Sequence, residues 1–532
     1  MFVLLGCGSS NDNNSSAPIV SVCAMNSVDN TTVSGAVTFD RVFHSGNALD
    51  YNNISSQWVR GAVVEIVCQA DGLTLVTGTT INDGTYSLSL PNDSKKVFVR
   101  VKAQMISEGL PAWNFTVVDN TQSKALYALD GSPFDLGTDP VNRNLHAPSG
   151  WTGSSYAGIR VAGPFAILDS VYDAFHKVLL ADPDANFPPL KLNWSKKNIA
   201  TSGVLSMGQI GSSFFNGDEI YLLGAENNDT DEYDDHVVIH EFGHYLEAKL
   251  SRSDSLGGDH NQSSRLDIRV AFSEGFSNAF SGITTDDPIY RDSNGIEQGN
   301  GFGFDLESNN CLVEGWYSEC SVQAIVYDLY DNDIDSIDTL GFGFMPLLDV
   351  FVNEQKNTNA MISIFSFIHH LKQNNPAEVS AIDTLVSDQS IDVIADVFGD
   401  SETGNNAGSM NVLPVHGQIS IDGTSVNVCS TNEFQAFNGL GVYRLLKFTA
   451  TASQRLTIRV NTTTGLGTNP DFYLYHKGQV VSAAESKTLN KETLNTPLLE
   501  VGKTYVIEVY EYDNVTNGPG VGTTCFDVSI SS

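Results

Sequence analysis

The chain has 532 residues, of which 41% are hydrophobic, so it is too long for one typical domain and apolar enough to bury several cores. Its formal net charge is −35, from 63 acidic and 28 basic residues. Such a negative surface repels nucleic acid and anionic membranes, which excludes nucleic acid as the expected partner. The same acidity is typical of secreted proteins that bind calcium or work in salt, and equally of chains selected for solubility.

Residues 1–18 contain a short apolar start followed by a tether rich in Ser and Asn, which is too polar to fold. The four residues Leu4-Leu5-Gly6-Cys7 resemble a bacterial lipobox, and that resemblance implies a lipid on Cys7. No other stretch approaches the roughly 18 apolar residues of a membrane span. We therefore expect an outer-membrane lipoprotein or a secreted protein, which touches a membrane only through the lipid on Cys7.

The remaining six cysteines fall into three regional pairs, each of which would close within one predicted domain. Paired cysteines indicate an oxidising, extracytoplasmic setting, and six unpaired thiols are the alternative. The expected disulfides are Cys23–Cys68, Cys311–Cys320 and Cys429–Cys525.

Residues 19–105 alternate in short strands separated by turns such as Asn82-Asp83-Gly84, which predicts an all-β sandwich. The run from Val33 to Ala103, with SGAVTF, RGAVVEIV and TINDGTYSLSLP, resembles a carboxypeptidase regulatory-like domain. The resemblance implies an accessory sandwich without chemistry of its own. Residues 106–150 are irregular and rich in Asn, Asp, Gly and Pro, and are expected to be a linker or to pack onto the next domain.

From 151 to 400 the apolar spacing becomes helical, with predicted helices at 161–181, 235–250 and 271–282. The pieces LKLNWS and EIYLLGA are predicted strands. The pieces SVQAIVYDLYD and AMISIFSFIHHLKQ are predicted to form further helices. A small sheet beside a helical half fits an α+β domain.

The segment DDHVVIHEFGHYLEAKL (234–250) places two histidines one turn apart on one face of an amphipathic helix. Two imidazoles at this spacing can bind one zinc ion, and the Glu beside the first can take a proton from water. This is the HExxH pattern of zinc metallopeptidases. It predicts His240 and His244 as zinc ligands and Glu241 as the catalytic base.

Catalytic zinc usually has a third protein ligand. The pattern HExxHxxGxxH, which extends the same helix, is excluded because Glu247 and Leu250 stand at its Gly and last His positions. A Glu on a second helix is the other solution, and AFSEGFSNAFSG (271–282) offers Glu274. Glu314 in CLVEGWYSEC, His260 and Asp267 remain as rival third ligands.

The Glu274 segment resembles the EGWSD-type helix of the fungalysin family and, more weakly, the ExxxD helix of thermolysin. The resemblance implies a gluzincin-type, zincin-like metallopeptidase domain over 151–400 with Glu274 as third ligand. Those families carry an Asp four residues later that supports a ligand His, and this chain has Asn278 there. An Asn carbonyl could still accept that hydrogen bond without the charge.

Hydrolysis at such a site also needs a donor to the oxyanion of the tetrahedral intermediate. Gluzincins often use Tyr or His for this purpose. The candidates in the chain are Tyr317, Tyr327, His369 and His370. The strand EIYLLGA could pair with an extended substrate by strand addition.

Two acidic runs make calcium a second candidate cofactor. NNDTDEYDD (227–235) precedes the HExxH helix, and either binds a cation or favours the helix N-terminus. DNDIDSID (331–338) alternates Asp as a calcium loop does, but it lacks the Gly and closing Glu of an EF-hand. Solvated turns are the alternative at both runs.

Strands return at 415–532, and the stretch from Tyr443 to Tyr512, with NPDFYLYHKGQVV and GKTYVIEVYEYDN, resembles a bacterial pre-peptidase C-terminal domain. The expected chain is thus multidomain, with an α+β zincin-like catalytic domain between two all-β sandwiches. The predicted function is zinc-dependent hydrolysis of protein or peptide substrates. The alternatives are an inactive peptidase that serves as a surface adhesion or binding protein, and a zinc aminopeptidase.

Overall fold

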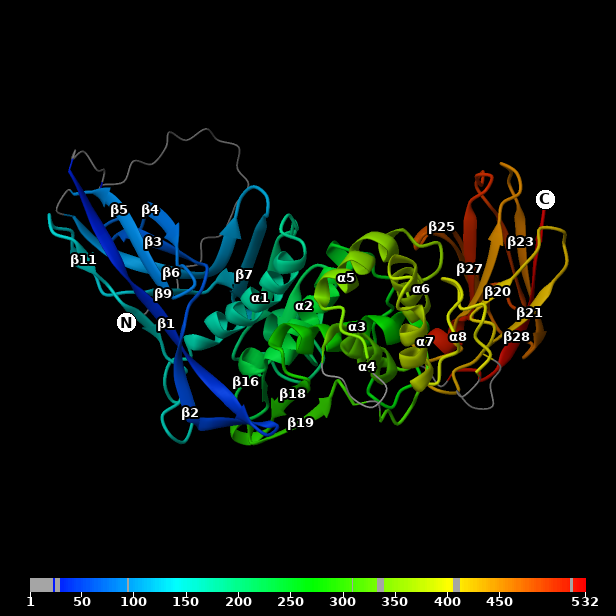
Figure 1. Cartoon of the computed structure of the whole chain (residues 1–532), viewed down its shortest axis with the longest axis horizontal. Helices are drawn as coiled ribbons and strands as arrows, with labels where there is room; N and C mark the ends of the chain where they lie inside the picture. Colours follow the sequence, from blue (N-terminus) through cyan, green and yellow to red (C-terminus); the bar gives the residue numbers. More distant parts are fainter. Residues whose placement is uncertain are drawn as a thin grey trace. The chain divides into compact units, whose positions relative to one another are not determined.

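A computed structural model describes Cys23 and residues 29–92, 95–308, 310–332, 339–404, 412–516 and 520–532 (Figure 1). The predictions for the tether and for a lipid on Cys7 lie outside these residues, as does most of the 331–338 run. Within the described ranges, no helix has the length and apolar character needed to cross a membrane. The chain forms two compact units, described separately below: residues up to Tyr245 with Thr284–Phe304, and Leu246–Ile283 with the residues from Asp305 onward.

The first unit contains two large sheets, which include the strands predicted for 19–105 and extend to residue 222. The five strands of the first are β1 (Asn30–Ser45), β2 (Ala48–Trp58), β5 (Thr85–Pro91), β11 (Val141–Asn142) and β12 (Leu145–Ala147). The ten strands of the second are β3 (Ala62–Cys68), β4 (Thr74–Thr79), β6 (Lys96–Ser107), β7 (Trp113–Asp119), β8 (Ala125–Leu126), β9 (Ala128–Asp130), β10 (Phe134–Asp135), β13 (Leu190–Trp194), β14 (Phe214–Phe215) and β15 (Ile220–Leu222).

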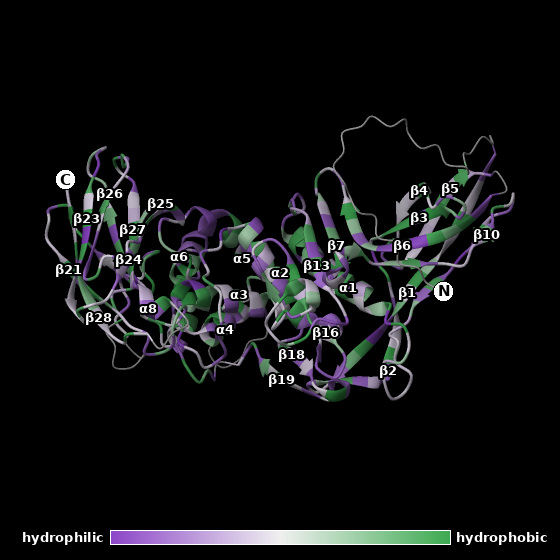
Figure 2. Cartoon of the chain, turned by 180° about the vertical axis from the view of Figure 1, so that it is seen from behind, coloured by the Kyte–Doolittle hydropathy of each residue, from purple (hydrophilic) through white to green (hydrophobic). Residues whose placement is uncertain are grey.

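Burial alternates along β1 and β6, as expected for strands with one face on a core, and Figure 2 shows the hydropathy along them. Residues 106–150 were expected to form a linker or to pack onto the next domain, and the structure shows strands in this stretch that pack onto neighbouring segments. Strand β7 pairs antiparallel with β6 and parallel with β13, and β12 pairs parallel with β1. Most strands in this stretch are too short or irregular to give a period-2 signal, and several have partners distant in sequence, so the sequence pattern did not reveal them.

A small third sheet and two long helices complete the first unit. The sheet has the order β16 (Gly224–Ala225), β17 (Asp229–Thr230), β18 (Ile289–Asn294) and β19 (Asn300–Asp305). The helices are α1 (Ala162–Ala181) and the first part of α2 (Asp235–Lys249), with short 3-10 turns η1 (Asn120–Gln122), η2 (Leu205–Met207), η3 (Asp231–Tyr233) and η4 (Ile296–Gln298).

The second unit begins with a helical layer. Its helices are most of α3 (Ile268–Thr285), then α4 (Glu319–Tyr330), α5 (Phe344–Asp349), the π-helical turn η5 (Val350–Gln355), α6 (Ile364–Asn374) and α7 (Val379–Asp388). Phe276 of α3 stacks on Phe351 with a centroid distance of 4.0 Å, and Phe367 of α6 packs against Phe272 and Phe276. The aromatic stripe predicted for 271–282 therefore forms part of this core.

The same unit ends in two packed sheets. One contains β20 (His416–Gln418), β22 (Arg444–Thr449), β24 (Pro470–His476), β25 (Gln479–Ala484) and β27 (Thr504–Glu511). The other contains β21 (Val426–Ser430), β23 (Thr457–Thr464), β26 (Lys491–Asn495) and β28 (Thr524–Ser531), and a short helix α8 (Tyr512–Val515) follows β27. Inward-facing side chains such as Leu446, Ile458 and Ile507 form one core, so a C-terminal β-sandwich is present.

All three predicted disulfides are confirmed. Cys23 is joined to Cys68 at the end of β3, Cys429–Cys525 joins β21 to β28, and Cys311–Cys320 closes the loop before α4. Three disulfides indicate folding in an oxidising, extracytoplasmic compartment. The fold is therefore a multidomain, mostly β structure with a helical part, and its α2 and α3 carry the predicted site.

Candidate metal centre

Helix α2 carries both predicted histidine ligands and packs its apolar side chains on the second sheet. Phe242 and Tyr245 both lie edge-on to Phe115 of β7, with ring centroids 5.6 and 6.3 Å apart. The hydroxyl of Tyr245 donates to the carbonyl of Pro188 at 2.5 Å. His240 and His244 project together from one face of the helix, as their i, i+4 spacing predicts.

The first turn of α2 is fixed by polar contacts within the first unit. Asp235 accepts from Arg41 of β1 and from the Ser170 hydroxyl of α1. Burial would raise the pKa of Asp235, but Arg41 and Ser170 outweigh burial and lower it. His236 contacts the carbonyl of Asp287 at 3.2 Å and the hydroxyl of Thr285, which ends α3. His236 is therefore a structural residue of this turn.

Helix α3 is connected to the last turns of α2 through Glu247. The hydroxyls of Ser273 and Ser253 donate to its carboxylate at 2.6 and 3.0 Å. Ser273 directly precedes Glu274, so this contact fixes the turn of α3 that carries the predicted third ligand. In the sequence, Glu247 only showed that the HExxHxxGxxH pattern is absent. In the structure, it positions the turn of α3 that carries Glu274.

Gly275 lets α3 approach α4 closely. A Cβ atom at this position would lie 2.5 Å from the Val322 Cβ and 2.7 Å from the Glu319 carbonyl oxygen. Both distances are shorter than real Cβ contacts, and the second involves backbone that cannot rotate away. The Gly after Glu274 is therefore needed for packing.

We expect Gly275→Ala to destabilise the protein by about 1–3 kcal/mol, because overpacking outweighs the better helix propensity of Ala. Chemical denaturation measures the change. Gly137→Ala is the matched control, since a Cβ there meets no atom within 4 Å. A Gly275→Ala variant as stable as the control would contradict the close packing of α3 on α4.

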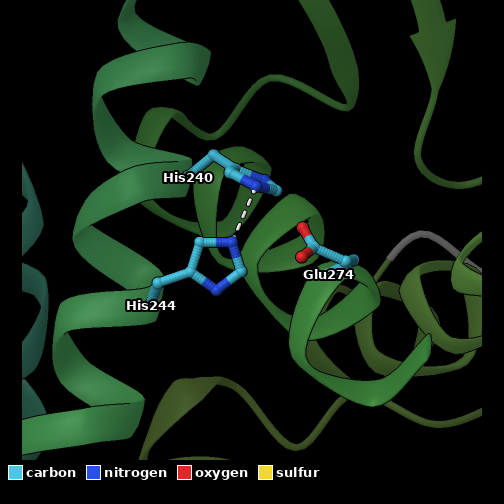
Figure 3. Close-up of side chains that lie close together, drawn as sticks. All are labelled: His240, His244 and Glu274. Carbon is cyan, nitrogen blue, oxygen red and sulfur yellow. Dashed lines mark hydrogen bonds between the residues drawn. The ribbon is translucent and has the colours of Figure 1, made fainter. Parts of the chain in front are cut away.

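His240, His244 and Glu274 each offer one ligand atom, and these atoms all lie within 4.8 Å of one another. Figure 3 shows the two imidazoles projecting from one helix toward the carboxylate on the next. The two Nε2 atoms face each other at 3.1 Å. Ligand atoms of tetrahedral zinc, each about 2.0–2.1 Å from the ion, are about 3.4 Å apart. The spacing and the two-nitrogen, one-oxygen donor set therefore fit zinc.

The carboxylate of Glu274 belongs to a polar network that no sequence pattern indicated. The His260 Nε2 lies 3.2 Å from Glu274, and its Nδ1 lies 2.6 Å from Glu319 of α4. Gln262 donates to Glu319 at 3.0 Å and exchanges hydrogen bonds with Gln323. His260, a rival third ligand by sequence, thus contacts the predicted third ligand. No local motif marks this role, because the loop that carries His260 has no periodic pattern.

Asn278 is buried, and its amide donates to the Gln323 side chain at 3.0 Å. Because Gln323 also contacts Gln262, this hydrogen bond connects Asn278 to the network around Glu319. Its expected role as acceptor from a ligand histidine stays a prediction.

The other rival ligands have separate partners. Glu314 accepts from the Ser390 hydroxyl at 2.7 Å. Asp267 pairs with Arg269 at 2.7 Å, and Arg269 also pairs with Glu508 of β27. These contacts give both acidic side chains a structural role.

The four candidate oxyanion donors lie on α4, α6 and the loop before α4. Tyr317 is buried against Trp316, and burial raises its pKa to about 12. Tyr327 is buried on α4, with its ring edge-on to Tyr330. His369 lies 2.9 Å from the Gln373 amide, and His370 lines a cavity of about 380 Å³ with Asn353, Glu354, Asn357, Thr358, Asn359 and Val397. The assignment of an oxyanion donor among them stays a prediction.

Tyr290 of β18 is a further residue beside the site. Its ring lies edge-on to His240, with the centroids 6.2 Å apart. Burial, followed by the negative charges of Asp292 and Glu241, raises its pKa well above the usual range, so the hydroxyl stays protonated. Sequence reasoning missed Tyr290, because β18 comes close to the HExxH helix only through tertiary packing and no pattern around the residue signals that proximity.

Comparisons with known proteins give limited similarity. No family model matches the chain, and no curated protein matches it. Among solved structures, the pre-peptidase C-terminal domain of a Bacillus anthracis collagenase is 17% identical, with a TM-score of 0.16, over 22% of this chain and 93% of that one. CorA, a surface-associated copper-binding protein of Methylomicrobium album BG8, is 9% identical over 22% of this chain and 96% of that one, with a TM-score of 0.17. PliG of Aeromonas hydrophila, a periplasmic lysozyme inhibitor, is 13% identical over 22% of this chain and 96% of that one, with a TM-score of 0.15.

Proposed function

We propose that the chain is an extracytoplasmic zinc metalloendopeptidase of the gluzincin type. The observation that carries the proposal is the convergence of His240, His244 and Glu274, whose ligand atoms lie within 4.8 Å of one another. Glu241 is buried beside His240 on the same helix, where a catalytic base is needed. Two imidazoles and one carboxylate are the ligand set of a catalytic zinc site, and a Glu beside the first His can serve as its base.

Zinc at this site supplies Lewis-acid activation of water and of the scissile carbonyl. His240 and His244 would hold the ion through imidazole nitrogens, and Glu274 would complete the ligand set. Glu241 takes a proton from the attacking water and returns it to the leaving nitrogen. His260, held by Glu319, positions the Glu274 carboxylate, as partners of ligand side chains commonly do.

The remaining parts of the proposal concern the flanking domains and the location. The N-terminal sandwich is proposed to be an accessory carboxypeptidase regulatory-like domain, and the C-terminal sandwich a pre-peptidase C-terminal domain. A lipid on Cys7 would hold the protein at the outer membrane, with a protein or peptide as the substrate. The three disulfides support an extracytoplasmic setting.

A panel of fluorogenic peptides tests this function against its two alternatives. We expect cleavage of peptides with blocked N-termini, loss of cleavage after zinc is removed with 1,10-phenanthroline, and recovery when zinc is restored. Cleavage confined to peptides with a free amine would favour a zinc aminopeptidase. No zinc-dependent cleavage of any peptide or of casein would favour a binding protein with an inactive peptidase domain.

A further inference from the structure

Four aspartates of the first unit gather beside the start of α2. Asp229 lies on β17, Asp231 on η3, Asp234 directly before α2, and Asp292 on β18. Each offers one carboxylate oxygen, and these oxygens lie within 4.8 Å of one another. Asp231 and Asp234 are only 2% and 0% exposed. We call these four residues the aspartate cluster.

The neighbouring acidic residues have their own cations, but the cluster does not. Glu232 pairs with Arg160, and Asp235 pairs with Arg41. Among the residues that the structure describes, no Lys or Arg forms an ion pair with any of the four aspartates. Asp234 contacts the His44 Nε2 at 2.8 Å and accepts from the backbone and hydroxyl of Ser293. The imidazole of His44 is thus the one titratable side chain that pairs with any of these four carboxylates among the described residues.

Some buried oxygens of the cluster have no donor among the residues that the structure describes. Within the described ranges, the Oδ1 atoms of Asp229, Asp231 and Asp292 have no hydrogen-bond partner. The other oxygen of Asp231 accepts from the Ser213 hydroxyl. A carboxylate oxygen that is buried without a donor is costly, so three at one place indicate a positively charged ligand.

The protonation behaviour agrees with this geometry. Burial and the neighbouring carboxylates raise the pKa of Asp292 to about 8, and burial is the largest cause of the rise to about 6 at Asp229. The Asp292 carboxyl therefore holds a proton at neutral pH when no cation is present, and a cation would displace that proton.

We propose that the aspartate cluster is a calcium site, separate from the zinc ligands. Its donors are carboxylate oxygens alone, which hard cations prefer, whereas zinc favours nitrogen and sulfur. A cation there would connect β17, the turn before α2 and β18. It would thereby hold the start of the helix that carries His240 and the strand that carries Tyr290.

The test uses the full chain, freed of metal by chelation, with CaCl2 titrated in thermal unfolding and Tb³⁺ as a luminescent probe. Tyr233 directly precedes Asp234, and Tyr290 lies near the charges of Asp292 and Asp231, so both can act as sensitisers. We expect a saturable rise in Tm with calcium and a Tb³⁺ signal that calcium displaces. Asp231→Asn and Asp292→Asn should weaken calcium binding at least tenfold. The exposed Asp184→Asn is the control with the same charge change.

The metal-free proteins give an independent readout. Asp231→Asn should melt at or above the wild-type Tm without calcium, because the substitution removes repulsion, and below it with calcium. Equal calcium responses in wild type and both cluster variants would overturn the proposal. Protons shared among the four carboxyl groups would then be what offsets their negative charge. Glu274→Ala should keep the full calcium response, so failure of the zinc proposal and failure of the calcium proposal are distinguishable.

Discussion

Glu241→Gln should lower peptide hydrolysis about 10³-fold, which corresponds to about 4 kcal/mol of transition-state stabilisation. The Gln side chain has nearly the same shape but cannot accept and return a proton. Glu241 is not among the predicted ligands, so zinc content and Tm should stay at their wild-type values. Measurement of kcat/KM on a cleaved peptide, with zinc analysis of the same sample, checks both expectations.

The exposed Glu226→Gln is the matched control and should retain full activity. Wild-type hydrolysis by Glu241→Gln would rule out Glu241 as the base. Loss of zinc together with activity would instead mean that Glu241 supports the metal site.

Arg269→Ala should destabilise the protein by about 3–5 kcal/mol. Arg269 is 2% exposed and lies between the buried carboxylates of Asp267 and Glu508. Its removal leaves two buried negative charges uncompensated. Burial already raises the pKa of Glu508, and Arg269 opposes that rise. Chemical denaturation of the variant measures the loss.

The loss of stability in Arg269→Ala should be smaller at pH 5 than at pH 8. A carboxyl group whose folded pKa is raised stabilises the folded state less as the pH rises above its unfolded value. Without Arg269 the folded pKa of Glu508 rises further, so acid relieves the penalty. Arg459→Ala, at an exposed position of β23, is the control and should change stability by less than about 1 kcal/mol. A similar small change in Arg269→Ala would contradict the buried ion-pair cluster.

The sequence predicted the local features of the site and missed its long-range ones. The i, i+4 spacing of His240 and His244 and the apolar stripe around Glu274 are local patterns, and α2 and α3 formed where these patterns lie. The pairing of cysteines followed from their regional grouping. In contrast, His260, Tyr290 and Asp292 reach their partners through loops and strand pairing, which no short-range period records.

The fold shows the same division. Long strands such as β1 and β6 carry a clear alternation of buried and exposed residues and were predicted within a β-sandwich. The short strands β8 to β12 have two or three residues each, so they carry no alternation, and their stretch was predicted only as a linker or as packing onto the next domain. Parallel pairing of β13 with β7 joins residues that are far apart in the sequence, as Leu190 and Phe115 show.

The most direct test of the zinc site is elemental analysis of wild type and of Glu274→Ala in parallel. About one zinc per chain in wild type and a sharp loss in the variant are expected, because catalytic zinc needs three protein ligands. Glu314→Ala should keep its zinc, since Ser390 is the partner of Glu314. Full zinc in Glu274→Ala, or none in wild type, would contradict a site built from His240, His244 and Glu274.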